Sequence, residues 1–173
     1  MFGQRTDWRN GTVFPLDRQF LRSLSGLDLS GTQRLAVAQY KPPTAGTVGK
    51  SAPYHILSHM KDLRTLTLTQ CNSLPFILAL NPNQNASKCA LCPKLEELVI
   101  YVEGLDSFNI EELMSMVKGW ASVGTNLSSI TIIGLGELML GKVFRLKQYV
   151  PHVEYRVGEE PPEWDAIPGD KVD

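Results

Sequence analysis

Large aliphatic residues recur along the chain in the pattern L-x-x-L-x-L, in which L is a large aliphatic residue. The pattern begins at Leu24, Leu63, Leu95 and Leu127, and a degenerate copy begins at Val150, so that the starts are 39, 32, 32 and 23 residues apart. The last three residues of each copy follow the buried, exposed, buried alternation of a strand. The pattern therefore predicts short strands near residues 27–29, 65–69, 97–101, 129–133 and 152–156.

Helical patterns lie between these strands. The clearest covers 109–124, where apolar residues from Ile110 onward recur at i, i+3, i+4, i+7 and i+11. Asn109 and Glu112 are spaced as in a capping box, and Gly124 suits a helix end. Shorter helices are predicted at 53–60, 74–80 and 142–150.

Each predicted strand and helix form a unit whose apolar face cannot be buried alone, so neighbouring units must stack. The aliphatic pattern and its spacing are those of leucine-rich repeats. We therefore predict an α/β fold, a short irregular leucine-rich-repeat solenoid with parallel strands on the concave side and helices on the convex side.

Composition supports an ordinary globular domain. Of the 173 residues, 43% are hydrophobic and 20% are charged, and the net charge of −1 provides no field that would attract nucleic acid or an acidic membrane. No apolar run approaches the ~20 residues of a membrane span, and no secretory signal is evident. Three cysteines, an odd number, fit a reducing compartment. We expect an intracellular protein, cytoplasmic or nuclear, with one domain over 1–157, a flexible loop at 41–53 and an acidic, disordered tail at 158–173.

The repeat region contains four longer segments, which are "LDLSGTQRLA", "MKDLRTLTLTQCNSLPFILALNPN", "CPKLEELVIYVE" and "HVEYRV". Together they resemble the leucine-rich-repeat region of fungal F-box/leucine-rich-repeat-like proteins, over about Leu24 to Val157. The resemblance implies a role in recruiting substrates to a cullin-type ubiquitin ligase. In that family, the F-box contacts the ligase adaptor and the repeats hold the target protein.

The chain departs from this family in one respect, because we find no F-box. The residues before Leu24 are too few for this three-helix module and show no helical apolar stripe. A ligase adaptor is therefore an expected partner only if an F-box lies upstream.

A G-x-x-x-x-G-K skeleton spans 136–142 and suggests an alternative function, a phosphate- or nucleotide-binding enzyme. A phosphate loop needs small or polar residues between its glycines, whereas 137–140 read Glu-Leu-Met-Leu. The residue after Lys142 should carry a hydroxyl for magnesium, but it is Val143. The repeat pattern explains the same residues as strand, turn and interior.

A second alternative is a zinc-stabilised module that uses His55, His59, Cys89 and Cys92, because Cys-x-x-Cys and two histidines at i, i+4 could form a Cys2His2 set. The chain has a repeat core and does not need a metal to fold, so we expect no metal and no cofactor. None of the histidines lies in a recognisable hydrolase motif, and we expect no enzyme activity.

The remaining function is recognition of a protein partner by outward-facing residues of the strands. These residues form a mostly neutral strip with an apolar centre and a charged end, and Tyr is a favoured interface anchor. The predicted partner-binding residues are Thr65, Thr67, Thr69, Glu97, Val99, Tyr101, Ser129, Thr131, Ile133, Glu154 and Arg156.

Overall fold

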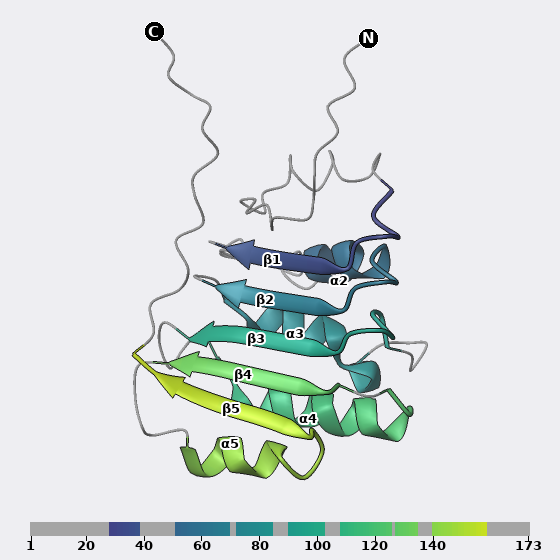
Figure 1. Cartoon of the computed structure of the whole chain (residues 1–173). Helices are drawn as coiled ribbons and strands as arrows, with labels where there is room; N and C mark the ends of the chain where they lie inside the picture. Colours follow the sequence, from purple (N-terminus) through teal and green to yellow (C-terminus); the bar gives the residue numbers. More distant parts are fainter. Residues whose placement is uncertain are drawn as a thin grey trace, which may run out of the picture.

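The computed structural model describes residues 28–38, 51–69, 72–84, 90–102, 108–125, 127–134 and 140–158. These residues form an α/β fold around one five-stranded sheet (Figure 1). Each strand pairs in parallel with the next one along the chain, so that the order in the sheet is the order in the sequence. The strands are β1 (Arg34–Ala38), β2 (Thr65–Thr69), β3 (Glu97–Val102), β4 (Ser129–Gly134) and β5 (His152–Val157).

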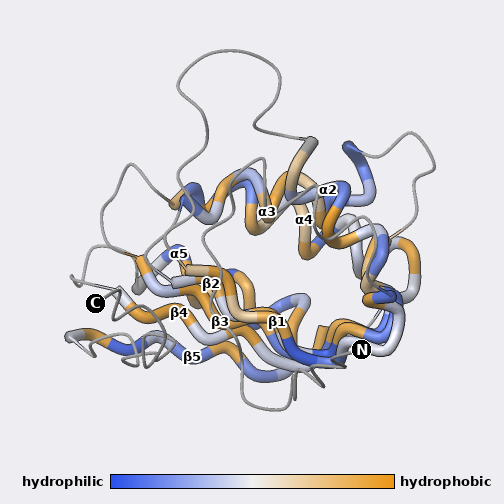
Figure 2. The backbone as a smooth tube through the Cα atoms, turned by 90° about the horizontal axis from the view of Figure 1, so that it is seen from above, coloured by the Kyte–Doolittle hydropathy of each residue, from blue (hydrophilic) through white to orange (hydrophobic). Residues whose placement is uncertain are grey.

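The helices form a layer on one side of this sheet (Figures 1 and 2). They are α2 (Ser51–Ser58), α3 (Leu74–Leu80), α4 (Ile110–Ser122) and α5 (Leu140–Leu146), with a short 3-10 helix, η3 (Pro82–Gln84), after α3. Apolar residues colour the facing sides of the two layers in Figure 2. The core lies between them, because alternate strand residues such as Leu66, Leu98 and Ile130 are completely buried.

Helix α4 shows why the sequence predicts its helices well. The Asn109 side chain accepts hydrogen bonds from the backbone N–H groups of Glu111 and Glu112, at 3.0 and 3.3 Å, and so satisfies two donors of the first turn. The helix ends before Gly124, whose φ of 72° is a conformation that glycine adopts without steric cost. The Glu112 carboxylate accepts from Gln84 Nε2, 3.4 Å away in η3, and thereby joins two neighbouring helices.

A buried cluster of hydrogen-bonded side chains joins α4 to α3. The Trp120 ring is 1% exposed, and its Nε1–H donates to the carbonyl of Leu80 at 2.7 Å. Asn81 is equally buried, and its Nδ2 donates to Ser115 Oγ at 3.1 Å, while its Oδ1 accepts from the backbone of Asn83 at 3.1 Å. These bonds satisfy polar groups at the end of α3 that burial would otherwise leave unpaired.

The predicted strand near 27–29 is wrong. The first strand is Arg34–Ala38, and Arg34 pairs in register with Thr65. The first-copy residues that match Leu63, Leu66 and Leu68 are therefore Thr32, Leu35 and Val37, and the anomalous spacing of 39 residues becomes 31. A threonine stands at the first aliphatic position of this copy, so "LSGLDL" matches the aliphatic pattern better than the true strand segment does.

The loop predicted at 41–53 also needs correction at its end, because Ser51–Pro53 belong to α2. Pro53 fits there since a helix's first turn requires no intrahelical N–H bond. The rest of that loop falls outside the described residues, as does the predicted tail from residue 159 onward.

A recurrent turn precedes the first three strands. The carbonyls of Leu29, Met60 and Cys92 each accept a hydrogen bond from the N–H three residues later, at 3.0 to 3.3 Å. All three side chains are buried. The turns are spaced 31 and 32 residues apart and give the same buried position to three different side chains.

Candidate functional site

The face of the sheet opposite the helices carries all of the predicted partner-binding residues. The register places them in three rows that cross the strands, at the strand starts, middles and ends. The middle row contains Thr67, Val99, Thr131 and Glu154, with Ala36 completing it on β1. No described helix covers this face (Figure 1).

Two residues of the predicted face are not available to a partner in this structure. Thr69 is 1% exposed and Ile133 is 4% exposed, so the expectation that they face outward to solvent is wrong. In the register, Ile133 lies between Tyr101 on β3 and Arg156 on β5. Thr69 Oγ1 is buried without a hydrogen-bond partner. The usable face is thus formed by the first two rows, together with half-buried Tyr101 and exposed Arg156.

A polar groove of about 320 Å³ crosses the starts of β1 to β4. Its wall is formed by strand-start residues and the residues that precede them, which are Gln33, Arg34, Arg64, Thr65, Glu96, Glu97, Ser128 and Ser129. The backbone of this edge repeats, since the carbonyls of Gln33, Arg64 and Glu96 each accept two successive N–H groups of the next strand.

The groove has an ordered charge pattern. Arg34 and Arg64 occupy the β1–β2 end, and Glu96 and Glu97 follow at the start of β3. Arg64 forms an ion pair with Glu96, and Thr65 Oγ1 donates to a Glu97 carboxylate oxygen at 3.2 Å. Guanidinium, hydroxyl and carboxylate groups together offer hydrogen-bond donors and acceptors to a polar segment of a ligand.

The predicted set omits two members of the row at the strand starts, of which only Arg34 also lines the groove. Arg34 and His152 belong to the same row as Thr65, Glu97 and Ser129, yet neither was predicted. Arg34 was missed because the first strand was misplaced. His152 lies within the predicted strand at 152–156, but only Glu154 and Arg156 of that strand belong to the predicted set. Arg64 and Glu96 are 32 residues apart, which is the spacing of one repeat. Because residues one repeat apart are neighbours in the sheet, this spacing could have identified the groove residues that the predicted set omits.

The charged end of the face lies on β5. Arg156 Nε and Glu154 Oε1 are 2.8 Å apart, and a second bond joins Arg156 Nη2 to Glu154 Oε2 at 2.8 Å. This hydrogen bond from Arg156 holds the pKa of the Glu154 carboxyl below its usual range. Both side chains remain about half exposed.

The G-x-x-x-x-G-K segment lies where β4 leads into α5. Its first four residues, 136–139, fall outside the described residues. Lys142 is exposed, and its Nζ lies 3.8 Å from Glu111 Oε1 on α4. The lysine of a phosphate loop would instead be directed at the bound phosphates. The placement of Lys142 gives the nucleotide alternative no support.

The residues of the zinc alternative do not converge where they are described. Cys92 is completely buried, and its Sγ donates to the carbonyl of Leu57 at 3.5 Å. Burial raises the pKa of the Cys92 thiol to about 12, which opposes the thiolate form that binds metal. His55 on α2 and His59 just after its end are exposed, with ring centroids 4.9 Å apart. Cys89 lies outside the described residues.

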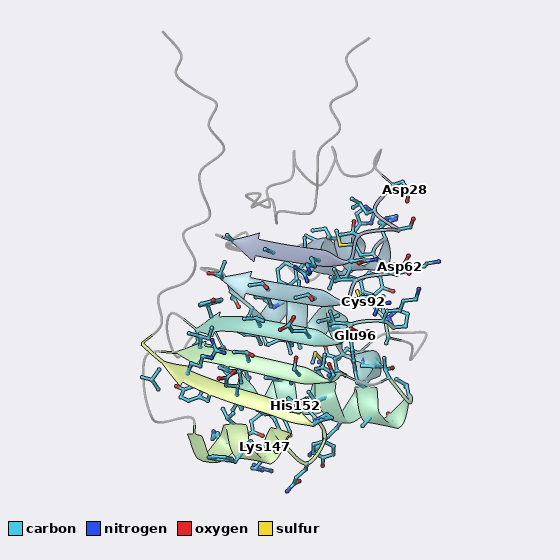
Figure 3. The ribbon with its side chains drawn as sticks, in the orientation of Figure 1. Asp28, Asp62, Cys92, Glu96, Lys147 and His152 are labelled. Atoms are coloured by element: carbon cyan, nitrogen blue, oxygen red, sulfur yellow. The ribbon has the colours of Figure 1, made fainter. Side chains whose placement is uncertain are left out.

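The recurrent turn explains Cys92 without a metal. Its side chain fills the position that Leu29 and Met60 fill before the two preceding strands. In Figure 3, Cys92 lies in line with Asp62 and Glu96 at the starts of the strands. Across the described part of the chain, no three His, Cys, Asp or Glu residues group in a way that could hold a metal ion.

Comparison with known proteins gives no match to a family model, to a curated protein or to a solved structure. Within the described ranges, none of the helices has both the length and the apolar character needed to cross a membrane.

Proposed function

We propose that this chain is a non-catalytic protein-binding domain of the leucine-rich-repeat type, and that it binds its partner with the open face of the sheet. One observation carries the proposal: the register gathers side chains from β2 to β5 on a single face that no described helix covers. Stacked parallel units that change their exposed strand residues while keeping a common framework are a general means of protein recognition.

The face offers two kinds of contact. Val99 and Tyr101 are half-buried apolar groups near its centre, and the groove beside them presents arginine, glutamate and hydroxyl groups. An apolar centre surrounded by polar groups is the usual anatomy of an interface between proteins. The partner is accordingly a protein that carries an apolar side chain next to a polar, charged segment.

A photo-crosslinking experiment tests this assignment. The crosslinker p-benzoylphenylalanine is placed at Val99 on the sheet face and, as a matched control, at exposed Ala121 on α4. We expect one defined protein to be captured from position 99 in cells, and not from position 121. Equal capture from both positions, or capture from position 121 alone, would refute the assignment of partner binding to the sheet face.

We further propose that the captured protein is a target of an F-box-type ubiquitin ligase. The support for this is the resemblance of the repeat segments to those of F-box/leucine-rich-repeat-like proteins. Deletion of the gene for this chain should then lengthen the half-life of the captured protein, measured after protein synthesis is blocked. An unchanged half-life would refute the ligase role and leave the binding face intact.

A further inference from the structure

The groove at the strand starts carries positive and negative side chains in equal number. Its wall contains Arg34 and Arg64 at the β1–β2 end and Glu96 and Glu97 at the start of β3, and its other members are neutral. A polyanion that filled the groove would be repelled by both glutamates, and a polycation would be repelled by both arginines. The groove therefore favours a ligand that carries charges of both signs.

Two of these four charges neutralise each other. Arg64 and Glu96 form an ion pair, in which both side chains are about half exposed. In the described part of the chain, no ion pair involves Arg34 or Glu97. The Glu97 carboxylate accepts a hydrogen bond from the neutral hydroxyl of Thr65 at 3.2 Å, which leaves its charge uncompensated. The net charges that the groove presents to a ligand are thus those of Arg34 and Glu97.

Arg34 and Glu97 belong to one row of the sheet, with Thr65 between them. Arg34 pairs in register with Thr65, and Thr65 pairs with Glu97. Neighbouring strands are about 4.8 Å apart, so the backbones of Arg34 and Glu97 are roughly 10 Å apart. The next residues of the two strands, Leu35 and Leu98, pack in the core, so alternation directs Arg34 and Glu97 to the open face. The row presents one positive and one negative group on the same face.

A peptide in the polyproline II conformation matches this separation of charges. Its residues i and i+3 lie on the same side, about 9.3 Å apart, because the helix has about 3 residues per turn and a rise of about 3.1 Å per residue. A strand-like peptide matches less well, since its residues on one side are about 6.8 Å apart. The backbone groups of a polyproline II segment make no internal hydrogen bonds, so they can bond the hydroxyl of Ser129, the next member of the row.

We propose that the groove binds an extended segment of the protein partner in which an acidic and a basic residue are three positions apart, with the acid at Arg34 and the base at Glu97. This inference rests on the proposed function, because it specifies the charge pattern of the protein that the sheet face binds. Val99 follows Glu97 by two residues on the same face, so the apolar centre adjoins the basic end of the bound segment.

Selection from a phage-displayed library of random peptides tests this charge pattern on the full chain. Wild type, Arg34→Glu and Glu97→Arg are screened in parallel at low ionic strength, where exposed charges are least screened. Peptides selected by wild type should be enriched about threefold or more over the library in opposite charges at i and i+3, as expected for exposed ion pairs. Glu97→Arg should instead select two acids at this spacing and Arg34→Glu two bases, because each reversal makes the two groove charges alike.

Neutral variants keep the test decisive if a reversal fails to fold. Arg34→Gln should lose the selection for an acid alone, and Glu97→Gln should lose the selection for a base alone. Lys142→Glu changes an exposed charge on α5, away from the groove, and is the control, which should select the same peptides as wild type.

Peptides whose charges do not follow the substitutions at Arg34 and Glu97 would overturn the inference. So would a wild-type chain that enriches no pair of opposite charges at i and i+3. Either result would leave the proposed function intact, because a failure of that function is seen separately, as equal crosslinking from positions 99 and 121.

Discussion

Trp120 is the largest fully buried side chain among the described residues, and its replacement by phenylalanine tests the packing of α4 on α3. The Leu80 carbonyl lies at the end of α3, where no later turn of the helix can supply a donor, and it accepts from Trp120 Nε1 at 2.7 Å. Phenylalanine fills most of the ring volume but leaves this carbonyl buried and unpaired. The unpaired acceptor costs about 1–3 kcal/mol. The lost volume of roughly 40 Å³ costs about 1 kcal/mol more.

Urea denaturation should therefore show the unfolding free energy of Trp120→Phe reduced by about 2–4 kcal/mol. For a chain of this size, the corresponding fall in melting temperature is roughly 4–16 °C. Tyr149→Phe, at a half-exposed ring, is the control and should change the free energy by less than about 0.5 kcal/mol. A loss below about 1 kcal/mol for Trp120→Phe would show that the indole N–H does not bond Leu80.

Three further substitutions probe other parts of the fold. A Cβ at Gly119 would lie 3.1 Å from Pro82 Cδ and 3.2 Å from Asn81 Oδ1. Although alanine favours helix, Gly119→Ala should therefore lower the unfolding free energy in urea by about 1–2 kcal/mol. A gain in unfolding free energy would show that α4 is not packed this closely on η3. Thr69→Val removes a buried hydroxyl without a partner and should raise the unfolding free energy by up to about 1 kcal/mol, whereas a clear loss would reveal a bond to that hydroxyl. Burial raises the pKa of Cys92 from 9.0 to about 12, so the neutral thiol stabilises the fold below pH 9 and this contribution is lost as the pH rises toward 12. The unfolding free energy of the wild type should fall relative to that of Cys92→Ala over this range, by at most about 1.4 kcal/mol per pH unit, and parallel curves would contradict the burial of the thiol.

The sequence predicts strands β2 to β5 because alternate residues of each are buried or, in β5, half-buried on one side. Leu66 and Leu68, for example, are both completely buried against the helices. It misplaces β1 because Thr32 stands where the other copies have leucine or valine. Leu29, which looks like the end of a strand, is a buried turn residue whose carbonyl accepts from Thr32. Only the pairing of Arg34 with Thr65 distinguishes the two possibilities.

The sequence likewise predicts the candidate site only in part. Alternation assigns Val99 and Thr131 to the open face, because side-chain direction is a local property of a strand. Exposure is not local, and Ile133, which alternation also assigns to the open face, is only 4% exposed. The zinc hypothesis fails to anticipate Cys92 for the same reason, since spacing in the sequence does not report that its thiol points into the core.

The affinity of the crosslinked partner for two arginine variants tests the central claim that the open sheet face binds protein. Val99→Arg places a charge at the centre of the face, and Ala121→Arg places the same charge on the exposed side of α4. Binding measured by titration calorimetry should weaken by about tenfold or more for Val99→Arg and by less than about twofold for Ala121→Arg, with both variants as stable as wild type within about 0.5 kcal/mol. Equal affinities for the two variants, or a loss confined to Ala121→Arg, would contradict the account.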